Sequence, residues 1–286
     1  MSSRWLLIHF LSIIVAIILS LFIVGHLLTG NASTAVGTLT TDFSAEPVQF
    51  SFNSAFPVHG WLVYGEPGKG VVLLVHSMRS NRLEMLSRAR FLNQQGFSIL
   101  LIDLQAHGES PGKRITFGAK ESQSVEAAVA FLRETFPHER IGAIGVSLGA
   151  AAVVLAKPAT RLDAVILESL HPTIEEAVEN RLKLHFGEHG SLLLPLILFH
   201  LSFYLDIPIK DLNPIENINN LNSPLLLISG TSDAHTTLPE TERLFAAARD
   251  PKEIWIIPGA GHFNMHSYAG RTYENRISAF LFQYLR

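Results

Sequence analysis

The chain has 286 residues, of which 48% are hydrophobic and 16% charged, with a formal net charge of −3 and no cysteine. It is too apolar for a disordered chain and long enough for one large domain with a buried core. The composition excludes disulfides, cysteine-ligated zinc and a thiol nucleophile, and the lack of a Lys/Arg stripe argues against a nucleic-acid partner.

The first predicted element is a long apolar helix. The run from Trp5 to Leu28 carries no formally charged residue. As a helix it would measure about 36 Å, more than the roughly 30 Å hydrocarbon core of a bilayer. A cleavable signal peptide is the competing interpretation, because Ser33-Thr34-Ala35 fits a small-x-small cleavage site. The run is longer than a signal-peptide core, so we predict a retained single-pass membrane anchor over residues 1–29.

The residues that flank this run predict its orientation. Arg4 precedes the run, and the next basic residue is Lys69. The positive-inside bias therefore keeps the N-terminus in the cytoplasm and places the following domain on the extracytoplasmic side. Residues 30–41 are mostly small and polar, so we expect a short linker that lifts the following domain, residues 42–286, off the membrane.

Beyond the linker, short apolar runs alternate with amphipathic ones. The apolar runs are rich in Val, Ile and Leu without strict alternation, as expected of strands buried on both faces. They are Val48–Phe52, Val58–Tyr64, Val71–His76, Ser98–Leu104, Ile141–Val146, Ala164–Leu167, Leu225–Ser229 and Ile254–Ile257. The helical patterns between and after them are Arg82–Gln95, Ala119–Phe136, Leu148–Lys157, Thr237–Ala248 and Tyr268–Tyr284. This order predicts an α/β fold with a mainly parallel central sheet and helices on both faces.

One segment interrupts the alternation. No clear strand lies between Glu168 and Leu225, and the stretch Ser191–Leu205 is intensely apolar but interrupted by Pro195. We expect a helical cap over about residues 171–210, inserted after the sixth strand, since long insertions in compact domains are usually lids or binding elements. The cap could accept an acyl chain, rest on the bilayer or simply pack on the sheet.

A pentapeptide at the end of the fifth strand indicates a nucleophile. Gly145-Val146-Ser147-Leu148-Gly149 ends a predicted strand and opens a helix, the context that a nucleophile elbow requires. Glycines on either side leave room for neighbouring backbone at this sharp turn. The amide of Leu148, at the helix N-terminus, can bind a developing oxyanion. We therefore predict Ser147 as the nucleophile.

A serine hydroxyl needs a base to remove its proton, and the base needs a carboxylate to orient it. His262 follows the last predicted strand and Asp233 follows the strand before it. The order Ser147, Asp233, His262 is the order used by G-x-S-x-G hydrolases. Glu168, which ends an earlier strand, is the alternative acid. We expect His235, near Asp233, to be an ordinary loop residue.

With these motifs the chain, from about Phe50 to the C-terminus, resembles an α/β-hydrolase. The resemblance is to the serine-hydrolase branch with lysophospholipase-like and acylglycerol-lipase-like enzymes. Val75-His76-Ser77-Met78 resembles the H-G-x oxyanion loop of that family, with Ser77 at the usual glycine position. The resemblance implies that the amide of Ser77 or Met78 joins that of Leu148 in the oxyanion hole.

A second turn carries the same resemblance. Asp103-Leu104-Gln105-Ala106-His107-Gly108-Glu109-Ser110 is similar to the family's D-x-R-G-H-G-x-S turn, with Gln105-Ala106 in place of Arg-Gly. In relatives this turn supports the elbow, so we expect His107 to be a supporting residue rather than a catalytic one.

The expected activity is hydrolysis of a carboxylic ester through an acyl-enzyme intermediate, with lipid-like esters and thioesters among the candidate substrates. The chemistry requires no metal, nucleotide or redox cofactor. The alternatives are a serine peptidase or amidase on the same scaffold and a non-catalytic binding protein with a hydrolase fold. His185-Phe186-Gly187-Glu188-His189 also fits the H-x-x-E-H pattern of zinc peptidases. That interpretation is disfavoured because Gly187 would interrupt the helix that must present both histidines.

Overall fold

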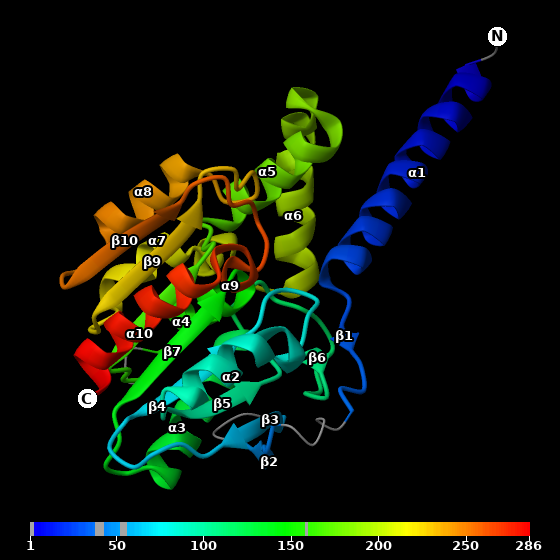
Figure 1. The fold of residues 1–286 in the computed structure, drawn as a ribbon. Helices are drawn as coiled ribbons and strands as arrows, with labels where there is room; N and C mark the ends of the chain where they lie inside the picture. The colour runs from blue at the N-terminus through cyan, green and yellow to red at the C-terminus, as the bar shows by residue number, and fades with distance from the viewer. Residues whose placement is uncertain (1–2, 38–42, 52–55, 158–159) are drawn as a thin grey trace.

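A central sheet organises the chain, for which the computed structural model describes residues 3–37, 43–51, 56–157 and 160–286. In these residues the sheet has eight strands in the order β10-β9-β8-β7-β4-β5-β3-β2 (Figure 1). The strands β2 and β3 pair antiparallel at one edge, β3 joins β5 antiparallel, and the remaining pairs are parallel. The strands are β2 Glu46–Phe50, β3 Val58–Val63, β4 Val71–Val75, β5 Ser98–Ile102, β7 Ile141–Val146, β8 Ala164–Glu168, β9 Leu225–Gly230 and β10 Lys252–Ile257.

The central strands are buried on both faces, which explains why their sequences do not alternate between apolar and polar residues. All five residues of β4 are inaccessible to solvent. Val71, Leu73 and Val75 face a core shared with α3 Glu121–Thr135, α4 Leu148–Leu155 and α8 Leu238–Ala247. Val72 and Leu74 face a second core shared with α2 Leu86–Gln94 and α10 Arg271–Leu285. The predicted sheet with helices on both faces is confirmed.

Differences from the predicted elements are confined to their ends. The leading strand runs from Glu46 to Phe50 rather than from Val48 to Phe52, and Phe52 lies outside the described residues. The helix expected from Arg82 begins as a 3-10 turn, η1 Arg82–Met85, and continues as α2. The helix expected over Tyr268–Tyr284 is divided into α9 Met265–Ala269 and α10 at Gly270, whose φ is +51°. Only glycine adopts such a φ without strain.

The expected cap follows β8 and has its own apolar core. It consists of α5 Ile174–Phe186, η2 Glu188–Leu193, α6 Leu194–Leu205 and η3 Ile209–Leu212. The helices α5 and α6 form a hairpin whose buried side chains include Val178, Leu182, Ile197 and Leu201. The short helices α7 Pro214–Asn217 and η4 Ile218–Asn220 then lead back to β9.

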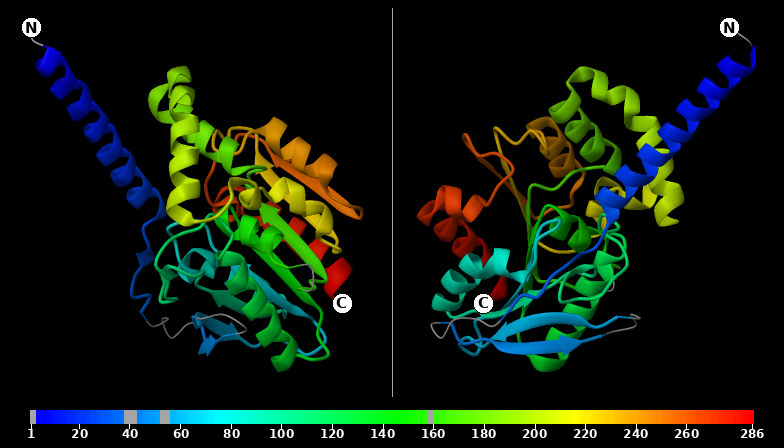
Figure 2. Two further views of the ribbon diagram at one scale, coloured as in Figure 1. Left: turned by 180° about the vertical axis from the view of Figure 1, so that it is seen from behind. Right: turned by 90° about the vertical axis from the view of Figure 1, so that its right-hand side faces the viewer.

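The N-terminal helix α1, Ser3–Thr29, projects away from the domain on the same side as the α5–α6 hairpin (Figures 1 and 2). Large apolar side chains are exposed along its length, including Trp5, Phe10, Leu19 and Ile23. Within the described residues, one stretch is long and apolar enough by length and composition alone to cross a membrane, Glu188–Leu205 in the cap. The sequence predicts such a span at the N-terminus, where several side chains of α1 are not described.

The segment expected to be a linker is bound to the domain. Its strand β1, Ala32–Ser33, pairs in parallel with β6, His107–Gly108. The Ala32 amide donates to the Ala106 carbonyl at 2.8 Å, and the Val36 amide donates to Glu109 Oε1 at 3.3 Å. These contacts hold residues 32–36 along the domain surface instead of leaving them as a free spacer. Residues 38–41 of the expected linker lie outside the described residues.

A buried polar cluster joins the sheet to two helices of one face. Arg88 from α2, Glu168 from β8 and Tyr273 from α10 are all fully buried. The Arg88 Nη2 and Glu168 Oε2 atoms lie 2.6 Å apart, and Tyr273 donates to Glu168 Oε1. Burial opposes the charge on Arg88, but the neighbouring Glu168 and Tyr273 outweigh burial and raise the pKa of the guanidinium. Glu168, at the end of β8, therefore has a structural role as the partner of Arg88.

The substitution Arg88→Met should lower the free energy of unfolding by about 3–5 kcal/mol, because it leaves the Glu168 carboxylate buried without its cation. Arg243→Met is the matched control. It removes a partly exposed pair with Glu176 and should cost less than about 1 kcal/mol. Chemical denaturation in detergent measures both values. Equal, small losses would show that the buried pair is not important for stability.

Candidate active site

Ser147 stands on a strained turn between β7 and α4. Its φ is +51° and its ψ −107°, a left-handed region that non-glycine residues rarely occupy. A Cβ atom at Gly145 would lie 2.7 Å from the backbone of Gly149, and one at Gly149 would lie 2.4 Å from the Val75 carbonyl oxygen. Both positions therefore require glycine, because α4 approaches the backbone of β7 and β4 this closely.

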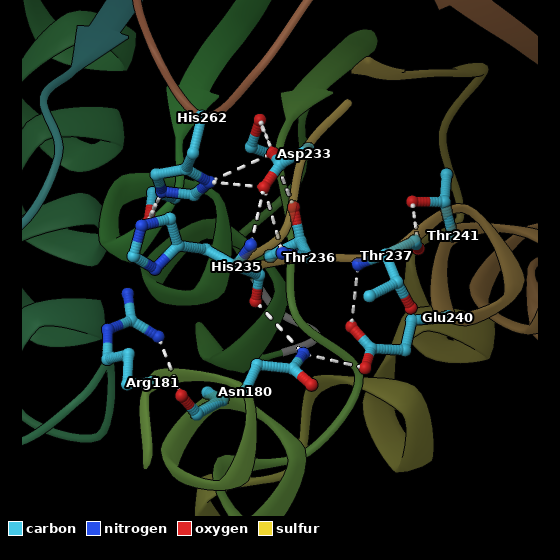
Figure 3. A network of polar contacts seen from close by, with 12 residues as sticks. Asn180, Arg181, Asp233, His235, Thr236, Thr237, Glu240, Thr241 and His262 are labelled. Atoms are coloured by element: carbon cyan, nitrogen blue, oxygen red, sulfur yellow. Dashed lines mark hydrogen bonds and ion pairs between the residues drawn. The ribbon is translucent and has the colours of Figure 1, made fainter. Parts of the chain in front are cut away.

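The three predicted triad residues meet at the carboxyl edge of the sheet, and Figure 3 shows two of them, His262 and Asp233. His262 Nε2 lies 3.2 Å from Ser147 Oγ, and His262 Nδ1 lies 2.9 Å from Asp233 Oδ2. Ser147 and Asp233 are almost completely buried, with 7% and 4% of their surface exposed. Asp233, and not Glu168, is the carboxylate at His262, since Glu168 is paired with Arg88.

Four donors besides His262 surround the Asp233 carboxylate. Oδ1 accepts from the amides of His235 and Thr236, both at 2.9 Å. Oδ2 accepts from the hydroxyls of Thr236 at 2.8 Å and Ser169 at 3.0 Å. Burial alone would raise the pKa of Asp233, but the hydrogen bonds from His262 and Thr236 outweigh it and lower the pKa to about 2. The carboxylate is therefore ionised at neutral pH and accepts from Nδ1–H of His262, which leaves Nε2 as a proton acceptor.

The loop after β4 supplies the second expected oxyanion donor. The Ser77 amide is already engaged, because it donates to Glu84 Oε2 at 2.9 Å, and the Ser77 hydroxyl donates to the same oxygen at 2.8 Å. The expectation that Ser77 could supply the donor is therefore wrong for its amide. Within the described residues, the amides of Met78 and Leu148 donate to no other protein group. These two are the candidate donors beside Ser147.

The neighbouring histidines have supporting contacts. His76 donates through Nδ1 to the Ser77 carbonyl at 2.7 Å and accepts through Nε2 from the Leu104 amide at 3.0 Å. Burial, reinforced by nearby His107, lowers the pKa of His76 to about 3. His107 is buried and donates to the Gln105 carbonyl. His76 therefore links the oxyanion loop to the turn that follows β5, and the ring of His107 lies 5.2 Å from the ring of His76, centroid to centroid.

The H-x-x-E-H motif does not form a metal site. The helix α5 ends at Phe186, and Gly187 adopts a φ of +65° that turns the chain into η2. His185 and His189 therefore lie on different elements, which removes the one-turn helical spacing that such a site needs. In the described part of the chain, no group of three or more His, Asp or Glu side chains is arranged to hold a metal ion.

A cavity of about 380 Å³ lies beside Ser147 and is lined mainly by apolar side chains. The cap contributes Ile174, Val178, Leu182 and Ile197. Three lining residues were not anticipated from the sequence, namely Phe117 from the loop before α3 and Leu27 and Leu28 from the end of α1. No sequence signal identifies them, because their neighbours in the cavity are distant along the chain: Leu28 lies 50 positions before Met78, and Phe117 lies 30 positions before Ser147.

Comparison with known proteins agrees with this geometry. A family model described as serine aminopeptidase, S33, matches residues 66–196, and a model of the prolyl oligopeptidase family matches residues 207–286. The chain belongs to the α/β-hydrolase superfamily. This hydrolase is 25% identical over 242 residues to the uncharacterized protein YqkD of Bacillus subtilis, with 82% of this chain and 79% of the relative covered.

Two solved structures have the same fold as this hydrolase. An esterase of Pyrococcus furiosus superimposes with a TM-score of 0.75 at 23% identity, covering 90% of this chain and 99% of the esterase. A monoacylglycerol lipase of Paleococcus ferrophilus superimposes with a TM-score of 0.56 at 22% identity, covering 80% of this chain and 99% of the lipase.

Three polar side chains of the hydrolase lie close to its triad. His171 and Arg181 line the cavity, and the ring of His235 lies 4.9 Å from that of His262, centroid to centroid (Figure 3). Burial, followed by the charges of Arg181 and His262, lowers the pKa of His171 to about 3. Burial also lowers the pKa of Arg181, whose Nη1 donates to the Ala177 carbonyl at 2.8 Å. His235 is thus a loop residue, as expected, that also contacts the predicted base.

The hydrolase should lose stability in mild acid partly through His171. The unfolded chain protonates this imidazole near pH 6.5, whereas the folded protein does so only near pH 3. Stability that is present above pH 6.5 is therefore lost as the pH falls through this window, by about 2 kcal/mol between pH 7 and pH 5. Denaturation at both pH values should show that His171→Leu reduces the pH-dependent difference by that amount.

The substitution His138→Leu, at an exposed histidine, is the matched control for the loss of one imidazole. An unchanged difference in His171→Leu would mean that this imidazole titrates alike in the folded and unfolded chains.

Proposed function

We propose that this hydrolase is a membrane-anchored serine esterase acting on carboxylic esters with an apolar acyl group, lipid-like esters and thioesters included. One observation carries the proposal. The Ser147 hydroxyl lies 3.2 Å from His262 Nε2 while Nδ1 of the same ring is held by Asp233, and an apolar cavity opens beside the hydroxyl. This arrangement suits nucleophilic attack on an acyl group whose chain occupies the cavity.

The reaction follows from these positions. His262 Nε2 accepts the Ser147 proton as Oγ attacks the acyl carbonyl, and the amides of Met78 and Leu148 stabilise the oxyanion. The tetrahedral intermediate collapses as the C–O bond to the leaving group breaks and His262 returns the proton to the departing oxygen. Water then attacks the acyl-enzyme, gives its proton to His262, and releases the carboxylic acid and free Ser147.

Ester hydrolysis is favoured over peptide hydrolysis because apolar side chains dominate the cavity beside Ser147. The solved relatives named an esterase and a monoacylglycerol lipase support this preference. A peptidase remains the second candidate, because the two matching family models are described as peptidase families. Hydrolysis of matched ester and amide substrates with the same acyl group distinguishes the two activities. Both candidates are favoured over a non-catalytic binding protein, because Ser147, His262 and Asp233 are all present and His262 lies within hydrogen-bond distance of the other two.

The proposed anchor is α1. The segment Trp5–Leu28 contains no formally charged residue, and the 27-residue helix that includes it measures about 40 Å. Among its described residues most of the large exposed side chains are apolar, with Arg4, His9 and His26 as the exceptions. Exposed apolar surface is costly in water and favourable in hydrocarbon. Because Arg4 precedes the helix, the N-terminus is proposed to remain in the cytoplasm with the catalytic domain on the extracytoplasmic side.

The substitution Ser147→Ala should abolish labelling by a fluorophosphonate probe and reduce ester hydrolysis to background, because the attacking oxygen is removed. Asp233→Asn keeps the side-chain shape but favours the wrong tautomer of His262, so kcat should fall by about 10⁴-fold. Gel fluorescence and initial rates measure these effects, with thermal unfolding as the control for folding. Labelling that persists undiminished in Ser147→Ala would contradict the assignment.

The proposed anchor predicts that the mature protein stays in the membrane fraction after sodium carbonate extraction, because Trp5–Leu28 remains uncleaved. Mass spectrometry of the extracted pellet should find peptides from this segment. A carbonate-soluble product that begins near Val36 would instead show that the segment is removed as a signal peptide.

A further inference from the structure

The end of α1 belongs to the cavity that contains Ser147. Leu27 and Leu28 line it together with Ser147, and Leu28 also packs against the apolar core of the cap. We infer that α1 is a wall of the acyl-binding pocket, and that the acyl chain of a membrane lipid ester enters between α1 and the α5–α6 hairpin. The inference rests on the proposed esterase function and names the route and the source of its substrate.

Specific contacts hold this wall in place. Gly25 is buried against α6, where a Cβ atom would lie 2.1 Å from His200 Nε2. The ring of Phe22 meets those of His200 and Tyr204 edge-on, at centroid distances of 5.6 and 6.0 Å. The Ile115 amide donates to the Thr29 carbonyl at 2.7 Å, which fixes the last turn of α1 to the domain. The end of α1 is therefore a packed element rather than a free tether.

The opposite walls of the cavity come from the cap. Val178 and Leu182 of α5 and Ile197 of α6 face the same space as Leu27 and Leu28. An acyl chain bound there would contact both the anchor helix and the cap. Because each buried methylene contributes about 0.8 kcal/mol, every methylene that this wall shelters changes the specificity constant by about fourfold.

Exposed apolar side chains also occur on both elements beside the cavity. On the α6 side, Leu192, Phe199 and Phe203 are 79%, 73% and 76% exposed. On the α1 side, Ile23 and Leu27 are 60% and 64% exposed. Both helices extend to the same side of the domain and diverge beyond their contact (Figures 1 and 2). A bilayer crossed by α1 is the environment that covers these surfaces, so its lipids reach the cavity without passing through water.

The absence of native cysteine permits a direct test in the full chain. Leu28→Cys places a single thiol in the proposed wall, and decyl methanethiosulfonate converts it to a mixed disulfide with release of methanesulfinate. Leu19→Cys is the matched control, because Leu19 is exposed on the same helix and outside the cavity. Each variant, reconstituted in lipid nanodiscs, is assayed with acetyl and decanoyl esters of one alcohol before and after modification.

Modification of Leu28→Cys should lower the ratio of decanoyl to acetyl hydrolysis at least tenfold, and dithiothreitol should restore it. Modification of Leu19→Cys should leave the ratio unchanged. Leu27→Cys provides a second thiol in the same wall with greater exposure, and it should behave like Leu28→Cys.

The inference would be overturned if mass spectrometry shows that Leu27→Cys or Leu28→Cys is completely modified while the ratio of decanoyl to acetyl hydrolysis is unchanged. Fluorophosphonate labelling of Ser147 in the same samples separates the two proposals. A protein that is labelled and hydrolyses both esters supports the esterase function even when the ratio does not respond. Failure of labelling and of all hydrolysis in the unmodified wild-type chain would instead reject the function itself.

Discussion

The carboxylate of Asp233 is ionised beside His262 although only 4% of the residue's surface is exposed. The surrounding loops supply the hydrogen-bond donors that such a buried charge requires. The two carboxylate oxygens accept from two backbone amides, two hydroxyls and the imidazole. Four of these donors come from the loops after β8 and β9, and one from the loop after β10. The parallel register of these strands brings the loops to one edge, so the sheet determines whether the charge at Asp233 can be buried at all.

Residues at the ends of parallel strands could be predicted from the sequence because such ends share one edge, whatever the intervening helices do. Ser147, Asp233 and His262 are of this kind. The role of Glu168 could not be predicted in this way. Its partner Arg88 lies 80 positions earlier on a helix, and nothing local marks the two as neighbours. Ser77 is a similar case, since its hydroxyl and amide both bind Glu84, which explains how a serine occupies a position where a glycine is expected.

The apolar segments show a different limit of prediction. The hydrophobicity of α1 and of the α5–α6 hairpin predicts that both have apolar faces that must be kept from water. It does not predict which element packs against which. Gly25 favours the packing of α1 against α6, because a Cβ atom there would require the His200 ring to move. A single glycine in an apolar run is an unremarkable signal in the sequence. Its importance becomes clear only when the helix that it contacts is known.

The pairing of β1 with β6 begins a series of contacts that runs from the segment after the N-terminal helix to the oxyanion loop. Val36, shortly after β1, donates to Glu109, and Glu109 is bound by Arg82 of η1. The same 3-10 turn carries Glu84, which holds Ser77 beside Met78. The hydrolase thus joins its N-terminal strand to the loop that carries Ser77 and Met78 through a short series of polar contacts, so that a shift at one end is passed to the other.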